Sequence, residues 1–125
     1  MIWRVGNDDL DRVWPKALGF LGPALNGADP EKVKEFIRSG NYQLWMTDKC
    51  ACTTAINDFP IGKVMTVVHL GGKGLEEWMF EGMSVLESWG RQQSCDRIRI
   101  NGRDEWSRVL PGFRKTSVVS EKVIS

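Results

Sequence analysis

The chain has 125 residues, which is enough for one domain around one hydrophobic core and too few for two. Hydrophobic residues make up 42% of it and charged residues 26%, as in an ordinary soluble globular protein. Its 17 basic and 16 acidic residues are interleaved, so the net charge of +1 gives no general reason to bind nucleic acid or an anionic membrane. We therefore predict one domain over residues 1–125, with a local basic strip around Arg97, Arg99 and Arg103.

Neither a membrane span nor a metal site is expected. No apolar run approaches the roughly 18 residues of a membrane span, and the N-terminal Met-Ile-Trp-Arg-Val is typical of a strand rather than a secretory signal. Three cysteines, Cys50, Cys52 and Cys95, together with a single histidine do not match a zinc spacing. Reduced thiols in a cytoplasmic protein are the expected reading.

The N-terminal part of the chain predicts a strand followed by a helix. Residues 2–5 form the strand, and Asn7, Asp8 and Asp9 offer N-caps for the helix. Pro15 lies inside this helix and should kink or divide it. The apolar residues of the helix recur at helical spacing: Leu10, Val13, Trp14, Ala17, Leu18 and Leu21.

A second helix and two strands follow. Asp29 is a natural N-cap with Pro30 at the first helical position, and Ser39-Gly40-Asn41 ends the helix. Residues 42–47 and 50–56 then predict strands, with a turn at residues 57–60. With the next strand they should form an antiparallel meander.

Residues 63–89 are the stretch around which we expect the chain to be organised. Its first part, with Val64, Val67 and Val68 around Met65, predicts a buried central strand over residues 63–70. Three glycines then interrupt the pattern, and a helix follows over about residues 74–91. A strand, a glycine turn and a helix leave free backbone N–H groups at a helix N-terminus, which favour an anion such as a phosphate. Two acidic residues in the first helical turn would compete with such an anion: Glu76 and Glu77.

The C-terminal part completes a mixed α/β fold. Residues 96–100 predict a strand that a right-handed crossover makes parallel to residues 63–70. A short helix carrying Trp106 and Leu110 and a last strand over residues 113–124 follow. The expected order is β-α-α-β-β-β-α-β-α-β.

This order, with His69-Leu-Gly-Gly-Lys-Gly74 before the long helix, resembles the GNAT fold of acetyl-CoA-dependent N-acetyltransferases over nearly the whole chain. The family's signature is Gln/Arg-x-x-Gly-x-Gly/Ala, and here His69 stands in the first position. The resemblance implies that backbone N–H groups of residues 70–75 cradle the coenzyme pyrophosphate, and that an N–H near Val67 or Val68 stabilises the oxyanion. The implied coenzyme contacts are Val67, Val68, Leu70, Gly71, Gly72, Lys73, Gly74 and Leu75.

The segment from Asn101 to Phe113 also resembles the family's last helix and the start of its last strand. In many members a tyrosine four residues before the strand's glycine is the general acid, and Arg108 occupies that position here. The Gly-Arg-x-x-Trp-x-Arg-Val-Leu pattern resembles small GNAT-like proteins of tailed bacteriophages, some of which are virion components.

The candidate catalytic residues each have a structural alternative. His69, the single histidine, has a side chain suited to a general base, or is a half-buried histidine beside the coenzyme, which is the favoured reading. Asn101 lies where acceptor and thioester would meet, or is a turn residue. Plain buried thiols are favoured over nucleophiles for the cysteines. Three carboxylates are looser candidates for acid–base work: Asp48, Asp58 and Glu105.

The leading interpretation is a cytoplasmic acetyl-CoA-dependent N-acetyltransferase with an unknown amine acceptor; if a phage encodes it, the compartment is the host cytoplasm or the virion. The alternative is a catalytically inactive GNAT-like phage protein that acts in virion assembly or as a binding module. The glycines favour the enzyme, and the missing tyrosine favours the alternative. The expected partners are the coenzyme and an amine, with a homo-oligomer or virion proteins as further possibilities and no nucleic acid or membrane.

Overall fold

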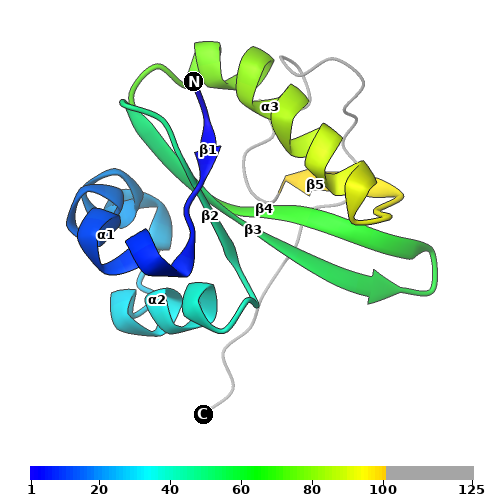
Figure 1. The fold of residues 1–125 in the computed structure, drawn as a ribbon, viewed down its shortest axis with the longest axis horizontal. Coiled ribbons are helices and arrows are strands. Elements are labelled where there is room, and N and C mark those ends of the chain that lie inside the picture. The colour runs from blue at the N-terminus through cyan, green and yellow to red at the C-terminus, as the bar shows by residue number, and fades with distance from the viewer. Residues whose placement is uncertain (101–125) are drawn as a thin grey trace.

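A five-stranded mixed sheet forms the centre of the molecule, and the computed structural model describes residues 1–100, without the side chains of Leu75, Glu76 and Met79 (Figure 1). The strands lie in sequence order, and the first three pairings are antiparallel while the last is parallel. They are β1 (Trp3–Arg4), β2 (Gln43–Met46), β3 (Cys50–Phe59), β4 (Gly62–Gly72) and β5 (Arg97–Ile100).

Helices cover both faces of this sheet (Figure 1). On one face lie α1 (Asn7–Leu21), the 3-10 helix η1 (Gly22–Leu25) and α2 (Pro30–Arg38). The other face carries α3 (Leu75–Gln92), which crosses from β4 to the parallel strand β5. The predicted mixed α/β order is confirmed from the first strand to β5, and the predicted last helix and last strand lie outside the described residues.

Each face of the sheet has its own hydrophobic core, because successive strand residues point to opposite faces. Leu44, Met46 and Ala51 pack towards α1 and α2, while Trp45, Cys50 and Cys52 pack towards α3. Met65 and Val67 of β4 join the α3 core, together with Trp78, Met83 and Leu86 of the helix itself.

The start and the continuity of α1 differ from the prediction. Gly6 is its N-cap, not Asn7, Asp8 or Asp9, and no side chain caps it. Pro15 does not divide the helix, which is continuous over 15 residues. A proline inside a helix costs about 3 kcal/mol, and burial of Trp14 and Ala17 on either side of it offsets that cost.

The second helix and the long hairpin also test the prediction. The Asp29 cap is confirmed, since its carboxylate accepts a 3.0 Å hydrogen bond from the Glu31 N–H. The turn predicted over residues 57–60 is wrong, because β3 continues to Phe59. Asn57 and Asp58 pair with β4, and a tight turn at Pro60-Ile61 is closed by Gly62 at a φ of 126°.

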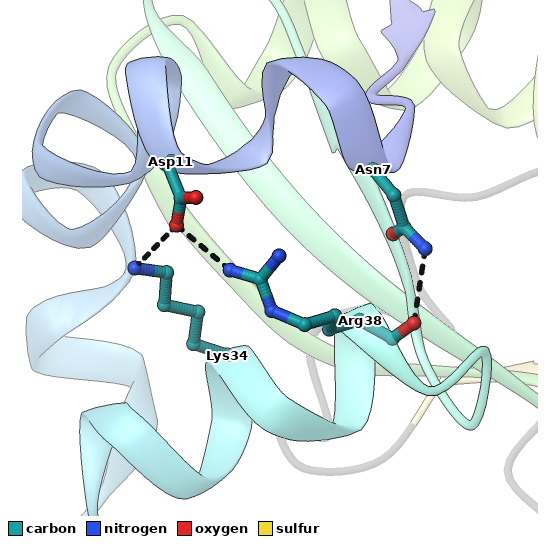
Figure 2. Close-up of polar contacts among 4 residues, drawn as sticks. All are labelled: Asn7, Asp11, Lys34 and Arg38. Atoms are coloured by element: carbon teal, nitrogen blue, oxygen red, sulfur yellow. Dashed lines mark hydrogen bonds and ion pairs between the residues drawn. The ribbon is translucent and has the colours of Figure 1, made fainter.

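Polar contacts join the two helices on the first face (Figure 2). Lys34 and Arg38 of α2 donate to the Asp11 carboxylate of α1 at 2.9 and 2.7 Å. The Asn7 side-chain amide donates to the Arg38 carbonyl oxygen at 3.0 Å, which ties the start of α1 to the end of α2. The hydrogen bonds from Lys34 and then Arg38 lower the pKa of Asp11.

This ion-paired carboxylate should make stability fall in acid. Its pKa is lower in the folded than in the unfolded chain, so its contribution is present above the ordinary aspartate pKa of about 3.9 and is lost as pH falls through the folded value. Asp11→Asn should therefore lower the free energy of unfolding slightly at pH 7 and not at pH 2, as measured by urea titration. Asp8→Asn is the control, since no ion pair within residues 1–100 involves Asp8. An equal loss at both pH values would contradict the assignment.

Candidate functional site at the end of strand β4

A β-bulge distorts β4 before it reaches α3. Thr53 pairs with His69 and Thr54 with Val67, so Val68 is an extra residue with no partner on β3. On the opposite edge of β4, the last β5 pairing is Val67 with Ile100. Val68 is thus the first β4 residue beyond the pairing with β5 that residues 1–100 describe.

The junction between β4 and α3 depends on glycine. A Cβ atom at Gly71 would collide with the Phe20 carbonyl oxygen at the end of α1, and one at Gly72 would collide with the backbone of Lys49 and Cys50. Gly72 has a φ of 120° and Gly74 a φ of 69°, which L-residues rarely adopt. These glycines bring three segments close together, and the fold needs two of them for packing whatever the site binds.

This packing predicts a clear order of stability among glycine variants. Gly72→Ala should lower the free energy of unfolding by about 2–4 kcal/mol, since it adds backbone strain to an overpacked contact. A Cβ atom at Gly19 in α1 would meet nothing within 4 Å, so Gly19→Ala should instead raise the free energy of unfolding by about 0.5–1 kcal/mol. Urea denaturation measures both. A Gly72→Ala protein as stable as the wild type would show that this junction is packed differently.

The first turn of α3 presents unused hydrogen-bond donors. No side chain caps the helix, and its first internal bond runs from the Trp78 N–H to the Gly74 carbonyl at 3.1 Å. The amides of residues 74–77 therefore have no partner within the helix. The Lys73 amide, by contrast, donates to the Lys49 carbonyl at 2.7 Å. Of the predicted cradle, the amides of Gly74 and Leu75 have no hydrogen-bond partner within residues 1–100, whereas the Lys73 amide has one.

The charges around this helix end are mixed. A cavity of about 230 Å³ lies between the first turns of α3 and the β2–β3 turn, and its lining includes Lys49, Lys73 and Glu77. The two lysines and the positive end of the helix dipole favour an anion, whereas three acidic lining residues oppose it: Asp48, Glu77 and Glu81. A phosphate-bearing ligand bound here would meet both signs of charge, so its affinity would depend on salt.

His69 lies six residues before the first residue of α3 and points to the opposite face of the sheet from that helix. Its Nδ1 is 2.7 Å from the Thr53 hydroxyl oxygen, and its ring meets the Tyr42 ring edge-on at 5.9 Å. Burial lowers the pKa of His69, so the ring is neutral at pH 7. Within residues 1–100 the Nε2 atom makes no hydrogen bond, and it can accept a proton in the tautomer whose Nδ1–H donates to the Thr53 hydroxyl.

The remaining predicted residues do not gather in one place. Cys50 and Cys52 are buried thiols, as expected, and burial raises the pKa of both. Asp48 lies in the β2–β3 turn beside the small cavity, whereas Asp58 lies near the tip of the β3–β4 hairpin. Asn101, Glu105 and Arg108 lie outside the described residues.

Sequence reasoning missed the side chains that surround His69. Thr53 and Tyr42 lie 16 and 27 positions away in the chain, and only the pairing of β2, β3 and β4 brings them together. The register needed to place them depends on the Val68 bulge, for which the sequence gives no signal.

Neither a metal centre nor a membrane-spanning helix is found among residues 1–100. No group of three or more histidine, cysteine, aspartate or glutamate side chains within residues 1–100 is arranged to hold a metal ion. Among the described helices, none combines the length and apolar composition needed to cross a membrane.

Comparison with known proteins finds similarity in structure only. No family model and no curated protein sequence matches the chain. An aminoglycoside acetyltransferase from an uncultured soil metagenomic sample superposes with a TM-score of 0.72 at 10% identity, covering 100% of this chain and 98% of the other.

Two further solved structures are similar to this chain in fold. Ribosomal-protein-alanine N-acetyltransferase from Brucella melitensis biovar Abortus 2308 has a TM-score of 0.65 at 16% identity, covering 100% of this chain and 97% of the other. A predicted acetyltransferase with acetyl-CoA from Clostridium acetobutylicum has a TM-score of 0.65 at 10% identity, covering 98% and 95%. This chain therefore has the fold of the GNAT acetyltransferases.

Proposed function

We propose that this protein is an acetyl-CoA-dependent N-acetyltransferase acting on an amine. The observation that carries the proposal is the junction of β4 and α3, where a bulged strand runs into a helix with free amides. Its support is the shared fold with acetyltransferases, one of which was solved with acetyl-CoA. The amides of Gly74 and Leu75 would hold the coenzyme pyrophosphate, and backbone groups of Val67, Val68 and Leu70 would align its thioester arm.

In such a reaction the neutral amine attacks the thioester carbonyl, and positioning of the two reactants supplies much of the rate. The attacking nitrogen must lose a proton, and the departing thiolate must gain one. We assign the first role to His69, because its ring is neutral and Thr53 holds one nitrogen while the other is free. The thiolate can take its proton from solvent.

The second candidate function is a binding protein of the same fold without chemistry, such as a phage virion component. The observation that favours it is Arg108 at the position where many GNAT enzymes have a catalytic tyrosine. A protein of this kind would retain the packing that requires Gly71 and Gly72, so the glycines alone do not separate the two functions.

The experiment that separates them combines two measurements on the whole chain. Release of coenzyme A is followed with amines, polyamines and peptides bearing free N-termini, and acetyl-CoA binding is measured by calorimetry. Turnover on any acceptor establishes the enzyme. Binding without turnover favours the second function. Absence of both binding and turnover would contradict the use of acetyl-CoA by this protein.

A further inference from the structure

A larger cavity, of about 770 Å³, lies at the sheet edge where β2 begins. We call it the β2 notch. Its walls come from the start of α1, the end of α2, the end of α3 and the edge of β3, represented by Asn7, Phe36, Trp89 and Ile56. Ile56 lies six residues along β3 from Cys50, the partner of Gly72, which is about 20 Å at the rise of an extended strand. The notch is therefore separate from the candidate coenzyme cradle.

Within residues 1–100, the floor of the notch is a strand edge that no other strand pairs with. The Cys50 carbonyl accepts from the Thr47 N–H on the β2 side, and the Lys49 carbonyl accepts from the Lys73 N–H on the β4 side. Because backbone groups alternate along a strand, those of Ile56 and Asp58 face the β2 side. The β2–β3 pairing ends at Gln43 with Thr54, and β3 continues beyond it with β4 (Figure 1). No strand within residues 1–100 pairs with Ile56 or Asp58 on that side.

Hydrogen bonds hold the walls of the notch apart from this edge. The Tyr42 N–H donates to the Phe36 carbonyl at 2.9 Å, so the chain before β2 is bound to α2 instead of continuing along β3. The Asn7 side chain joins α1 to the Arg38 carbonyl at 3.0 Å (Figure 2). The start of β2 at Gln43 is thus a fixed feature of the fold, and within residues 1–100 it leaves backbone donors and acceptors of β3 without a ladder partner.

The walls also carry side chains suited to an extended peptide. Phe36, 46% exposed, and Tyr42 lie in edge-on contact at 5.2 Å on the α2 side. Trp89 lies on the α3 side, with the Arg4 guanidinium 5.5 Å from its ring centre. A strand sends alternate side chains to opposite faces, so one added strand would reach both aromatic walls. Arg4 is the one formally charged side chain among the described lining residues and favours an acidic residue beside Trp89, whereas the exposed Asp58, further along β3 and outside the lining, opposes one at that end.

We infer that the β2 notch is a docking site for an extended, acidic peptide segment of another protein, which adds a strand to β3 at Ile56 and Asp58. Main-chain hydrogen bonds supply affinity in strand addition, and side-chain pockets supply specificity. This inference does not depend on the proposed acetyl transfer, because neither the coenzyme nor His69 takes part in it.

The test uses NMR of the uniformly labelled whole chain with the peptide acetyl-Val-Glu-Val-Thr-Val-Glu-amide. Saturable shifts of the Ile56 and Asp58 amides, with slowed hydrogen exchange, are expected. The same peptide N-methylated at alternate residues should cause none, since it cannot form the ladder. Absence of shifts at millimolar peptide overturns the proposal, as does protection of both amides in the free protein, which would show that the edge is already paired.

Two variants locate the contact. Asp58→Pro removes an outward-facing N–H without taking a β3–β4 hydrogen bond, and it should weaken binding about fivefold, the equivalent of one hydrogen bond. Asp58→Ala keeps the N–H and is its control, and the melting temperature of each verifies folding. Arg4→Gln should weaken binding of the acidic peptide. Binding of a peptide with lysine in place of each glutamate should stay unchanged. Equal binding by Asp58→Pro and Asp58→Ala would place the peptide elsewhere.

Discussion

His69→Ala is expected to lower kcat for acetyl transfer by about 100-fold or more, the usual contribution of a positioned general base. Thr53 lies 2.7 Å from one ring nitrogen, which leaves the other for the amine. Tyr42→Phe is the matched control, because it removes a hydroxyl while keeping the ring that meets His69 edge-on. Its kcat should stay close to that of the wild type.

The pH profile gives this prediction a second readout. Burial lowers the pKa of His69, so protonation inactivates the base only below the ordinary histidine value of about 6.5. The rate should hold at neutral pH and fall in acid, and His69→Ala should abolish that fall. The unfolded chain binds the proton more readily than the folded one, so stability should also decline as pH drops below about 6.5. Turnover unaffected by His69→Ala, with the acid limb unchanged, would assign the base to another group.

Local chemistry explains what the sequence predicted well. Asp29 caps α2 by a bond to an amide two residues away, and the helix between residues 63 and 100 makes the connection long enough for the parallel crossover that is observed. These features depend on neighbours in the chain. The length of β3 depended instead on pairing: Asn57 and Asp58 have turn chemistry, but they pair with Val64 and Lys63.

The sequence predicted which segment forms the candidate site, but not how that segment packs against the rest of the fold. Glycine spacing indicated the strand, the turn and the helix, but not that Gly71 and Gly72 pack against α1 and β3. The same contacts use the Lys73 amide, which the family resemblance alone assigned to the coenzyme. The extent of the domain and the role of Asn101 stay predictions.

Acetyl-CoA is expected to raise the melting temperature of the protein by roughly 10 °C when its free concentration is 100 times the Kd. A ligand that binds only the native state then contributes about 2.7 kcal/mol, and each kcal/mol is worth about 4 °C for a chain of this size. S-Acetylpantetheine, which lacks the pyrophosphate, should give a much smaller shift at equal concentration. A thermal melt with each compound, at low and high salt, measures the difference.

Charge variants show whether that stabilisation comes from the first turn of α3. Glu77 opposes an anion there, so Glu77→Gln should tighten acetyl-CoA binding about 2- to 5-fold while slightly destabilising the free protein, since an acid at this position favours the helix dipole. Glu87→Gln, ten residues further along the helix, is the control and should leave the affinity unchanged. Equal shifts with acetyl-CoA and S-acetylpantetheine, together with no effect of Glu77→Gln, would place the coenzyme away from this helix end. No shift at millimolar acetyl-CoA would favour the non-catalytic function, because the packing of Gly71 and Gly72 then accounts for the glycine junction by itself.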